Sequence, residues 1–400
     1  MNTPFEPGTP PQEGFVPLCI PEIRGNEWKY IKECLDTNWV SSVGAYVDRF
    51  EAGLADFVGA PYAVAVVNGT AALHISLLVA GVQLEDEVLV SSMTFIAPVN
   101  VIRYTGAWPV FIDSDPETWQ MDPQQVSDFL DNECESRDGA LWNRHTGRRI
   151  RAIIPVHILG HPVDMDPIMA AARKHGLTVI EDATESLGAR YKGQMTGCIG
   201  DIACFSFNGN KLITTGGGGM IVTAREAWAE KARYLTTQAK DDQVEFVHNE
   251  IGYNYRLTNV LAALGVAQLE QIEDYIAAKR RIADTYDAAF RDIPGLTLMP
   301  DAPWASSVKW MYTILIDEDA YGMDSRALLN KLSEAHIQTR PLWQPAHLSL
   351  AHADAFAMPC PVAERLKRDA LSLPCSVGLT EAQQQRVIDV VRNGSCQVYG

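Results

Sequence analysis

The chain has 400 residues, 47% apolar and 21% charged, which is typical of a folded globular protein with a sizeable core. Its 33 basic and 50 acidic side chains give a net charge of −17, which excludes nucleic acid as the main partner because phosphate neutralisation needs clustered lysine and arginine. Single cysteines without C-x-x-C pairs, no apolar run of about 18 residues and no signal-peptide pattern predict a cytoplasmic protein that neither crosses nor anchors in a membrane.

From about residue 60, short apolar runs rich in β-branched residues alternate with helical segments. Helices are expected at 71–81 and 166–175, each ending at a glycine. The expected strands are 63–67, 87–92, 109–113, 151–156, 177–182, 202–207 and 219–223. Near-continuous apolar strands separated by helices indicate an α/β fold with a parallel sheet that helices cover on both faces.

Two regions depart from this alternation. Segment 128–150 has mixed charge and no clear period, so it is expected to be a surface insertion or a helix plus a turn. Residues 256–290 have a continuous helical period, which predicts one long helix linking two lobes. A strand at 311–316 and a helix at 325–335 then suggest a smaller α+β domain. We therefore expect a flexible N-terminal arm (1–16), a large domain (17–265), and a linking helix with a small C-terminal domain (266–400).

Polar residues at the carboxyl ends of the expected strands are the first candidates for a site, because ligands of open parallel sheets bind there. Gly69 and Thr70 lie between a strand and a helix, where glycine permits close approach and the helix start offers free N–H groups to a phosphate. A plain helix cap and tight turn is the competing interpretation. Asp182 follows an apolar strand, and it suits either a buried ion pair or a protonated ring nitrogen.

Lys211 follows the next strand and precedes four glycines, 216–219. A solvated loop lysine is the common interpretation, and a nucleophilic amine is the functional one. The glycine run is not G-x-G-x-x-G, so a dinucleotide is poorly supported. A phosphate turn, an aromatic residue, a strand-end aspartate and a lysine, in this order, are what pyridoxal phosphate needs.

Six segments together resemble the DegT/DnrJ sugar aminotransferases, which are fold-type-I pyridoxal-phosphate enzymes: 40–51, 68–74, 91–100, 181–189, 206–219 and 252–265. The resemblance covers about residues 20 to 390. It implies a large domain with a mostly parallel mixed sheet, a smaller α+β domain, and pyridoxal 5'-phosphate that alternates with pyridoxamine phosphate. It also implies a homodimer with shared active sites, in which Asn254 reaches the phosphate held by the neighbouring subunit.

The resemblance carries further roles onto matching positions. It implies that Lys211 bonds to the cofactor and shuttles a proton, while Asp182 pairs with the ring nitrogen. Phe95 occupies the ring-stacking position, and Gly69, Thr70 and Ser206 hold the phosphate. Glu185 stands where many members have glutamine or histidine, although some members that aminate C4 of a sugar also have glutamate there. Dehydratase relatives replace the lysine with histidine, so Lys211 favours transamination over the dehydratase alternative.

Segments 25–44 and 146–167, with the run 181–186, resemble the LegC-type aminotransferases of legionaminic-acid synthesis. This implies L-glutamate as the donor and a UDP-linked 2-acetamido-2,6-dideoxy-4-ketohexose as the acceptor, for the synthesis of surface glycan sugars. The alternative is a perosamine-type synthase that acts on a GDP-linked 4-keto-6-deoxymannose.

The remaining candidates have weaker patterns. His157 and His161 lack a third ligand at metal-site spacing, so no metal is expected. Arg256 suits a donor carboxylate, a sugar phosphate or an ion pair at the dimer interface. In the small domain, the substrate candidates are Tyr312, Arg340, Trp343 and His347, with domain packing as the alternative for each.

Overall fold

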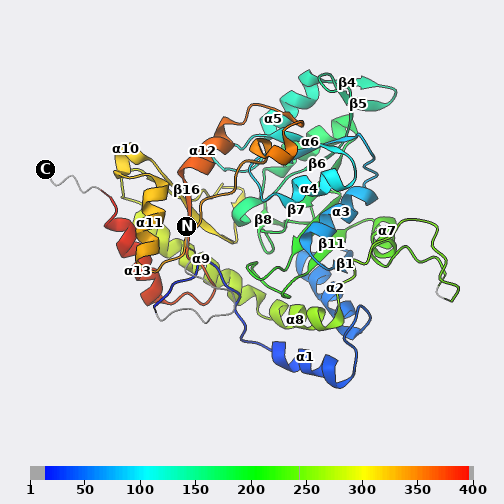
Figure 1. Ribbon diagram of the computed structural model, residues 1–400, viewed down its shortest axis with the longest axis horizontal. Coiled ribbons are helices and arrows are strands. Elements are labelled where there is room, and N and C mark those ends of the chain that lie inside the picture. Colours follow the sequence, from blue (N-terminus) through cyan, green and yellow to red (C-terminus); the bar gives the residue numbers. More distant parts are fainter. Residues whose placement is uncertain (1–13, 243, 396–400) are drawn as a thin grey trace.

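The computed structural model describes residues 14–242 and 244–395 (Figure 1). A ten-stranded sheet runs through the larger part of the chain, in the order β1-β11-β10-β7-β6-β2-β3-β15, with β5 paired to β6 and β4 paired to β5. Its strands are β1 Tyr62–Val66, β2 Glu87–Ser91, β3 Trp108–Ile112, β4 Cys134–Arg137, β5 Ala140–Asn143, β6 Arg149–Ile154, β7 Thr178–Asp182, β10 Ile202–Ser206, β11 Gly219–Thr223 and β15 Phe356–Ala357. Most neighbours are parallel, but β11 pairs antiparallel with both β1 and β10. The mixed, mostly parallel sheet is confirmed.

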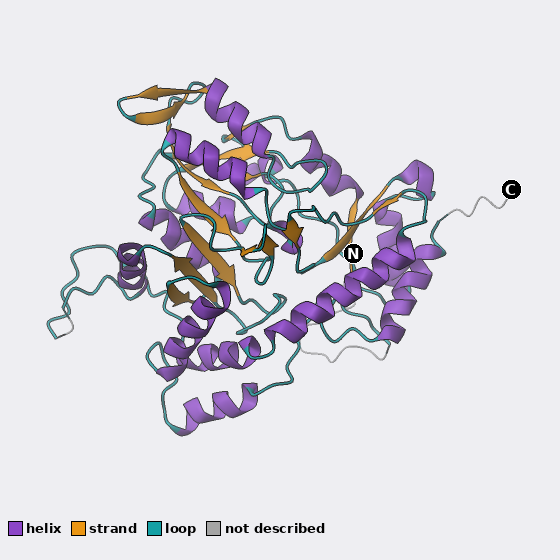
Figure 2. Cartoon of the chain, turned by 180° about the vertical axis from the view of Figure 1, so that it is seen from behind, coloured by secondary structure: helices purple, strands orange, loops and turns teal. Residues whose placement is uncertain are grey.

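Helices cover the sheet on both faces (Figure 2). Within β2, Val88 and Val90 join one core while Leu89 joins a second core on the opposite face. This alternation explains why the strands read as continuous apolar runs, since both faces are buried. The helices before the linking region are α1 Glu27–Asp36, α2 Ala45–Val58, α3 Gly69–Val79, α4 Ala97–Tyr104, α5 Pro123–Asp128, α6 Met165–His175 and α7 Glu226–Thr236.

The single helix expected over 256–290 is wrong: the structure has two, α8 Asn259–Leu269 and α9 Ile272–Phe290. Gln271 leaves helical geometry, with φ of −108° and ψ of 2°. No glycine or proline marks this break, but Glu270 accepts hydrogen bonds from Asn26 and Tyr30 at 2.7 Å each. The break between the two helices therefore coincides with tertiary contacts to the N-terminal segment, which the helical period of the sequence does not reveal.

The insertion at 128–150 forms a β-hairpin, β4–β5, after a π-helical turn at Phe129–Glu133. The hairpin projects from the edge of the molecule (Figure 1). Asp138 and Gly139 connect its strands with φ values of 53° and 74°. Asp-Gly is a sequence signal for such a turn, so the expectation of a helix plus a turn overlooked it.

Two small sheets complete the fold: β12 Leu296–Thr297 with β14 Tyr312–Ile316 and β16 Ala370–Leu373, and β13 Ala305–Ser306 with β8 Arg190–Tyr191 and β9 Gln194–Met195. The remaining helices are α10 Glu318–Tyr321, α11 Ser325–Glu334, α12 Pro361–Asp369 and α13 Glu381–Arg392. Of the expected arm, residues 1–13 lie outside the described residues, whereas Val16 is buried and its N–H donates to His336 O at 2.9 Å. The chain is therefore already packed at residue 16.

The division of the chain at residue 265 stays a prediction. Among the residues that the structure describes, no helix is both long and apolar enough to cross a membrane.

Candidate active site

A cavity of about 420 Å³ opens beyond the carboxyl ends of β1, β7 and β10. These strands point the same way, because β1 and β10 are both antiparallel to β11 and β10 is parallel to β7. The sheet therefore brings together polar residues that are far apart in the sequence. The lining of the cavity includes Gly69, Thr70, Thr94, Phe95, Asp182, Glu185, Ser206, Lys211, Trp310 and Trp343.

Helix α3 points its N-terminus into this cavity. Asn68 caps the helix, since its Oδ1 accepts the N–H of Ala71 at 2.7 Å. The first N–H groups of a helix have no partner within it, and they carry the positive end of the helix dipole. A Cβ at Gly69 would lie 2.9 Å from Ser206 Cβ, so only glycine lets β10 and the helix start come this close. The arrangement suits a bound phosphate.

Asp182 ends β7 and is 2% exposed. Its Oδ1 accepts the N–H of Thr184 at 3.1 Å. Burial raises the pKa of Asp182, against the hydrogen bond from Thr184 and the positive charge of Lys211. A buried carboxyl group with a raised pKa is stabilised in its ionised form by a nearby cation, and a protonated ring nitrogen supplies one.

Lys211 lies between an acid and an aromatic ring. Its Nζ is 3.5 Å from Glu185 Oε1 and 4.1 Å from the centroid of the Trp310 ring, and the side chain is only 14% exposed. Burial raises the pKa of Glu185, and the charge of Lys211 opposes that shift. The other Glu185 oxygen accepts the N–H of Leu159 at 2.8 Å, which fixes the carboxyl group beside the amine.

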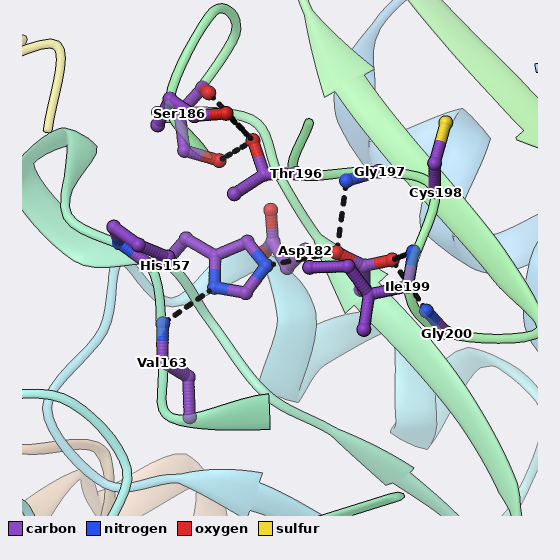
Figure 3. Close-up of polar contacts among 12 residues, drawn as sticks. His157, Val163, Asp182, Ser186, Thr196, Gly197, Cys198, Ile199 and Gly200 are labelled. Carbon is purple, nitrogen blue, oxygen red and sulfur yellow. Dashed lines mark hydrogen bonds and ion pairs between the residues drawn. The ribbon is translucent and has the colours of Figure 1, made fainter. Parts of the chain in front are cut away.

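A buried network anchors the strand end next to Asp182 (Figure 3). Glu181 accepts the N–H groups of Gly197, Ile199 and Gly200, and it pairs with His157 Nε2 at 3.1 Å. Burial alone would raise the pKa of Glu181, but His157 and these N–H groups hold it below its ordinary value. His157 Nδ1 accepts the N–H of Val163, so the ring proton sits on Nε2. The contacts of His157 are thus structural.

His161 is also packed rather than open to a ligand. Its Nδ1 donates to Pro162 O at 2.8 Å, and its Nε2 accepts the N–H of Ala302 at 3.1 Å. Burial lowers the pKa of His161 to about 4. Within residues 14–242 and 244–395, no group of three or more His, Cys, Asp or Glu side chains is arranged to hold a metal ion.

Two substrate candidates lie outside the cavity, contrary to expectation. The Tyr312 hydroxyl donates to Asp287 Oδ1 at 2.6 Å in the core of the small sheet, and Tyr312 is 1% exposed. Arg256 forms a buried ion pair with Glu51 of the same chain. Neither residue lines the cavity, and each polar group has a partner elsewhere in the chain.

The other candidates lie near the cavity or on the surface. The main chain of Arg340 pairs with Ser372, and its guanidinium donates to Thr339 O at 3.0 Å. His347 Nδ1 is 2.6 Å from Ser92 Oγ, and its Nε2 is 3.3 Å from Glu364. Asn254 is exposed and pairs through its main chain with Thr237. The roles expected for these residues stay predictions.

The sequence interpretation missed Trp310, and it placed Thr94 at a strand end without giving it a role. Trp310 Nε1 donates to Asn210 O at 2.8 Å, which holds the ring under Lys211. It lies just before β14, and no local pattern marks it. Within the described part of the chain, the Thr94 hydroxyl oxygen is buried without a hydrogen-bond partner, and it lines the cavity.

The residues present fit pyridoxal phosphate. The start of α3 and Ser206 would hold its phosphate, Asp182 would face its ring nitrogen, and Lys211 would supply the amine. Phe95, at the cavity wall, is 54% exposed and therefore has a free ring face. The buried, unpartnered hydroxyl of Thr94 adds a polar group that lacks a partner within the described chain.

Replacing Gly69 with alanine is expected to weaken cofactor binding by roughly tenfold, equivalent to about 1.4 kcal/mol, because the new methyl group would displace Ser206. Titration of the cofactor-free protein, followed by visible absorbance, measures this. Gly25→Ala is the matched control, since a Cβ there meets its neighbours at an ordinary 3.5 Å. Equal affinities for the two variants would argue against phosphate binding at the α3 start.

Three comparisons with known proteins place the chain among sugar aminotransferases. The sequence profile of the DegT/DnrJ/EryC1/StrS aminotransferase family matches residues 21–392. The GDP-perosamine synthase of Caulobacter vibrioides is 39% identical over 374 residues, covering 93% of this chain and 96% of that protein. EpsN of Bacillus subtilis, whose assigned name calls it a pyridoxal phosphate-dependent aminotransferase, is 40% identical over 382 residues, 94% of each chain. A DegT DnrJ EryC1 StrS aminotransferase from Brucella abortus has a TM-score of 0.85 and 28% identity, covering 93% of this chain and 96% of the solved one.

Proposed function

Because the chain belongs to the DegT/DnrJ/EryC1/StrS aminotransferase family of pyridoxal-phosphate-dependent sugar aminotransferases, we propose that it moves an amino group from L-glutamate to C4 of a nucleotide-linked 4-keto-6-deoxy sugar. We place this reaction in the cytoplasm and in a homodimer. One observation carries the proposal: Lys211, Asp182, Glu185 and the start of α3 line a single cavity of about 420 Å³. The cavity thus offers a helix start for the cofactor phosphate, a carboxylate for its ring nitrogen and an amine for the reaction.

Bound pyridoxal phosphate supplies an electron sink for the negative charge that develops at the reacting substrate carbon. Lys211 Nζ removes the proton from the α-carbon of glutamate, and it later delivers a proton to C4 of the sugar. One amine thus acts first as the base and then as the acid. Glu185, 3.5 Å from this amine, holds it in place. Asp182 stabilises positive charge on the ring nitrogen, and the α3 start binds the phosphate.

The acceptor is proposed to be a UDP-linked 2-acetamido-2,6-dideoxy-4-ketohexose. Support comes from the resemblance of 146–167 to LegC-type aminotransferases, a segment that begins beside the β4–β5 hairpin and continues through β6. The name of the Caulobacter vibrioides relative favours a second candidate, a GDP-linked 4-keto-6-deoxymannose. The hairpin lies outside the cavity lining.

The homodimer has support of its own in exposed apolar side chains. On and just after α1, Trp28 is 76% exposed, Trp39 53% and Val43 67%. Exposed apolar groups concentrated in one region are typical of surfaces that bind another protein. Phe95, at the cavity wall, is also large and exposed. The role proposed for Asn254, on the phosphate of the neighbouring subunit, requires this second copy.

Purified protein incubated with glutamate and a panel of UDP-, GDP- and dTDP-linked 4-ketosugars is expected to release 2-oxoglutarate fastest with the UDP sugar. Light scattering on the same preparation should give twice the 44.1 kDa mass of the chain. If the GDP-linked sugar is turned over at least as fast as the UDP-linked one, the acceptor is the GDP-linked sugar instead. If no sugar of the panel supports the release of 2-oxoglutarate, the proposed function is overturned.

A further inference from the structure

A buried lysine outside the cavity lies next to the sulfur atoms of two cysteines. Lys279, on α9, is 2% exposed, and its Nζ lies 3.5 Å from Cys19 Sγ and 3.6 Å from Cys375 Sγ. The same ammonium donates to Trp310 O at 2.8 Å and to Cys375 O at 2.6 Å. A buried charge is costly without an opposite charge nearby, and carbonyl groups are neutral. The countercharge this ammonium needs therefore points to a thiolate at one of the two sulfurs.

The two cysteines lie on chain segments that run beside each other. The N–H of Cys375 donates to Leu18 O at 2.8 Å, and the N–H of Ile20 donates to the Ser376 hydroxyl at 3.0 Å. Their sulfur atoms both lie within 3.6 Å of the same Lys279 nitrogen. A disulfide requires closely spaced backbone segments, and these adjoining segments provide them.

Cys19 also has the chemistry of a reactive thiol. The hydrogen bond from Cys375 and the charge of Lys279 lower the pKa of Cys19 to about 6, against the effect of burial. At neutral pH this sulfur is therefore mostly thiolate, which is the nucleophilic form. Cys198, which is partly exposed like Cys19, differs: burial raises its pKa to about 11.

We propose that Cys19 and Cys375 form an oxidative modification site that hydrogen peroxide closes to a disulfide. The Cys19 thiolate attacks one peroxide oxygen, the O–O bond breaks, and the departing hydroxide takes up a proton to leave as water. The Cys375 sulfur then attacks the Cys19 sulfur, the S–O bond breaks, and a second water leaves with the thiol proton. The two thiols lose two electrons, and the peroxide is reduced to two waters.

This site adjoins the loop that carries Lys211. The Cys19 Sγ lies 3.5 Å from Asn210 O, the same oxygen that accepts the N–H of the Trp310 ring. Closing the disulfide binds this sulfur to Cys375 and so changes the surroundings of the loop next to the reacting amine. Because the thiol pair belongs to the chain itself, the inference does not depend on which sugar the enzyme uses.

The test treats the holoenzyme with hydrogen peroxide, blocks the remaining thiols, and digests with trypsin. Cleavage places Cys19 in the peptide ending at Arg24 and Cys375 in the peptide 369–386, and neither contains another cysteine. The two peptides should appear joined, lighter by two hydrogens than their sum, and dithiothreitol should separate them. Cys19→Ser and Cys375→Ser should each remove the joined pair, whereas the control Cys198→Ser should retain it.

Other products would overturn the proposal. These are Cys19 recovered only as a sulfinic acid, Cys19 joined to Lys279 through an oxygen atom, or both thiols fully blocked after peroxide. Thermal melting of each serine variant at the wild-type temperature shows that loss of the joined pair reflects the missing thiol rather than unfolding.

Discussion

Replacing Lys211 with arginine is expected to abolish transamination, with kcat falling by at least about 10⁴-fold. Lys211 is the amine of the cavity, held between Glu185 and the Trp310 ring. Arginine keeps the positive charge, so the ion pair and the fold should survive. Its guanidinium stays protonated at neutral pH, and it can neither bond to the cofactor nor accept a proton from glutamate. Release of 2-oxoglutarate with a 4-ketosugar acceptor measures the loss.

The matched control is Lys192→Arg. Lys192 is exposed and pairs with Asp166 at 2.5 Å on the surface, so the same substitution there should leave kcat unchanged. The visible absorbance of the lysine-bound cofactor should disappear only in the Lys211 variant. A Lys211→Arg enzyme with a kcat within tenfold of wild type would show that another group moves the proton.

Replacing Asp182 with asparagine is expected to lower kcat by about 10³-fold while the protein still binds the cofactor. The amide has nearly the same shape, but it cannot stabilise positive charge on the ring nitrogen. In the cofactor-free protein the same substitution is expected to increase the stability of the fold. Burial raises the pKa of Asp182, so ionising this group costs folding free energy, and the amide avoids that cost.

The pH dependence of this second effect follows from linkage. The folded pKa lies above the ordinary value of 3.8, so the cost is present at neutral pH and disappears below about pH 4. Urea unfolding of the cofactor-free proteins should therefore find Asp182→Asn more stable than wild type at pH 7 and equal to it near pH 3. Asp284→Asn, on the exposed face of α9, is the control for both measurements. An Asp182→Asn enzyme with wild-type kcat would contradict the role of the carboxylate.

The strands of the large sheet could be predicted closely from sequence. The run 202–207 became β10 Ile202–Ser206, and 219–223 became β11 Gly219–Thr223. Such runs are informative because a strand buried on both faces must be apolar at every position. The β4–β5 hairpin was missed although Asp138-Gly139 marks its turn, since its strands are half exposed and have no continuous apolar run.

The part of the candidate site at the strand ends of the large sheet was also predictable. Gly69, Asp182, Ser206 and Lys211 each lie at or just after a strand end, and parallel strands bring their carboxyl ends to one edge of a sheet. The small-domain residues were not predictable in this way. Tyr312 and Trp310 are near neighbours in sequence, yet Trp310 lines the cavity and Tyr312 packs in the core.

The strong acidity of the chain says little about this cavity. A net charge of −17 argues against nucleic acid as the main partner, yet the proposed ligands are all anions. The site offers them the start of α3 and Lys211. Local groups can reverse the sign of the field within a cleft.

By itself the sequence determined the sheet, the order of the cofactor residues along it, and the family. Each of these depends on local patterns of apolar and polar residues. Only the tertiary structure decided that Trp310 lies under Lys211 and that Arg256 pairs with Glu51. It also decided that Lys279 lies beside two cysteines that are far apart in the chain. These contacts arise from packing between distant segments, where many partners are compatible with the same local pattern and only the folded core selects one.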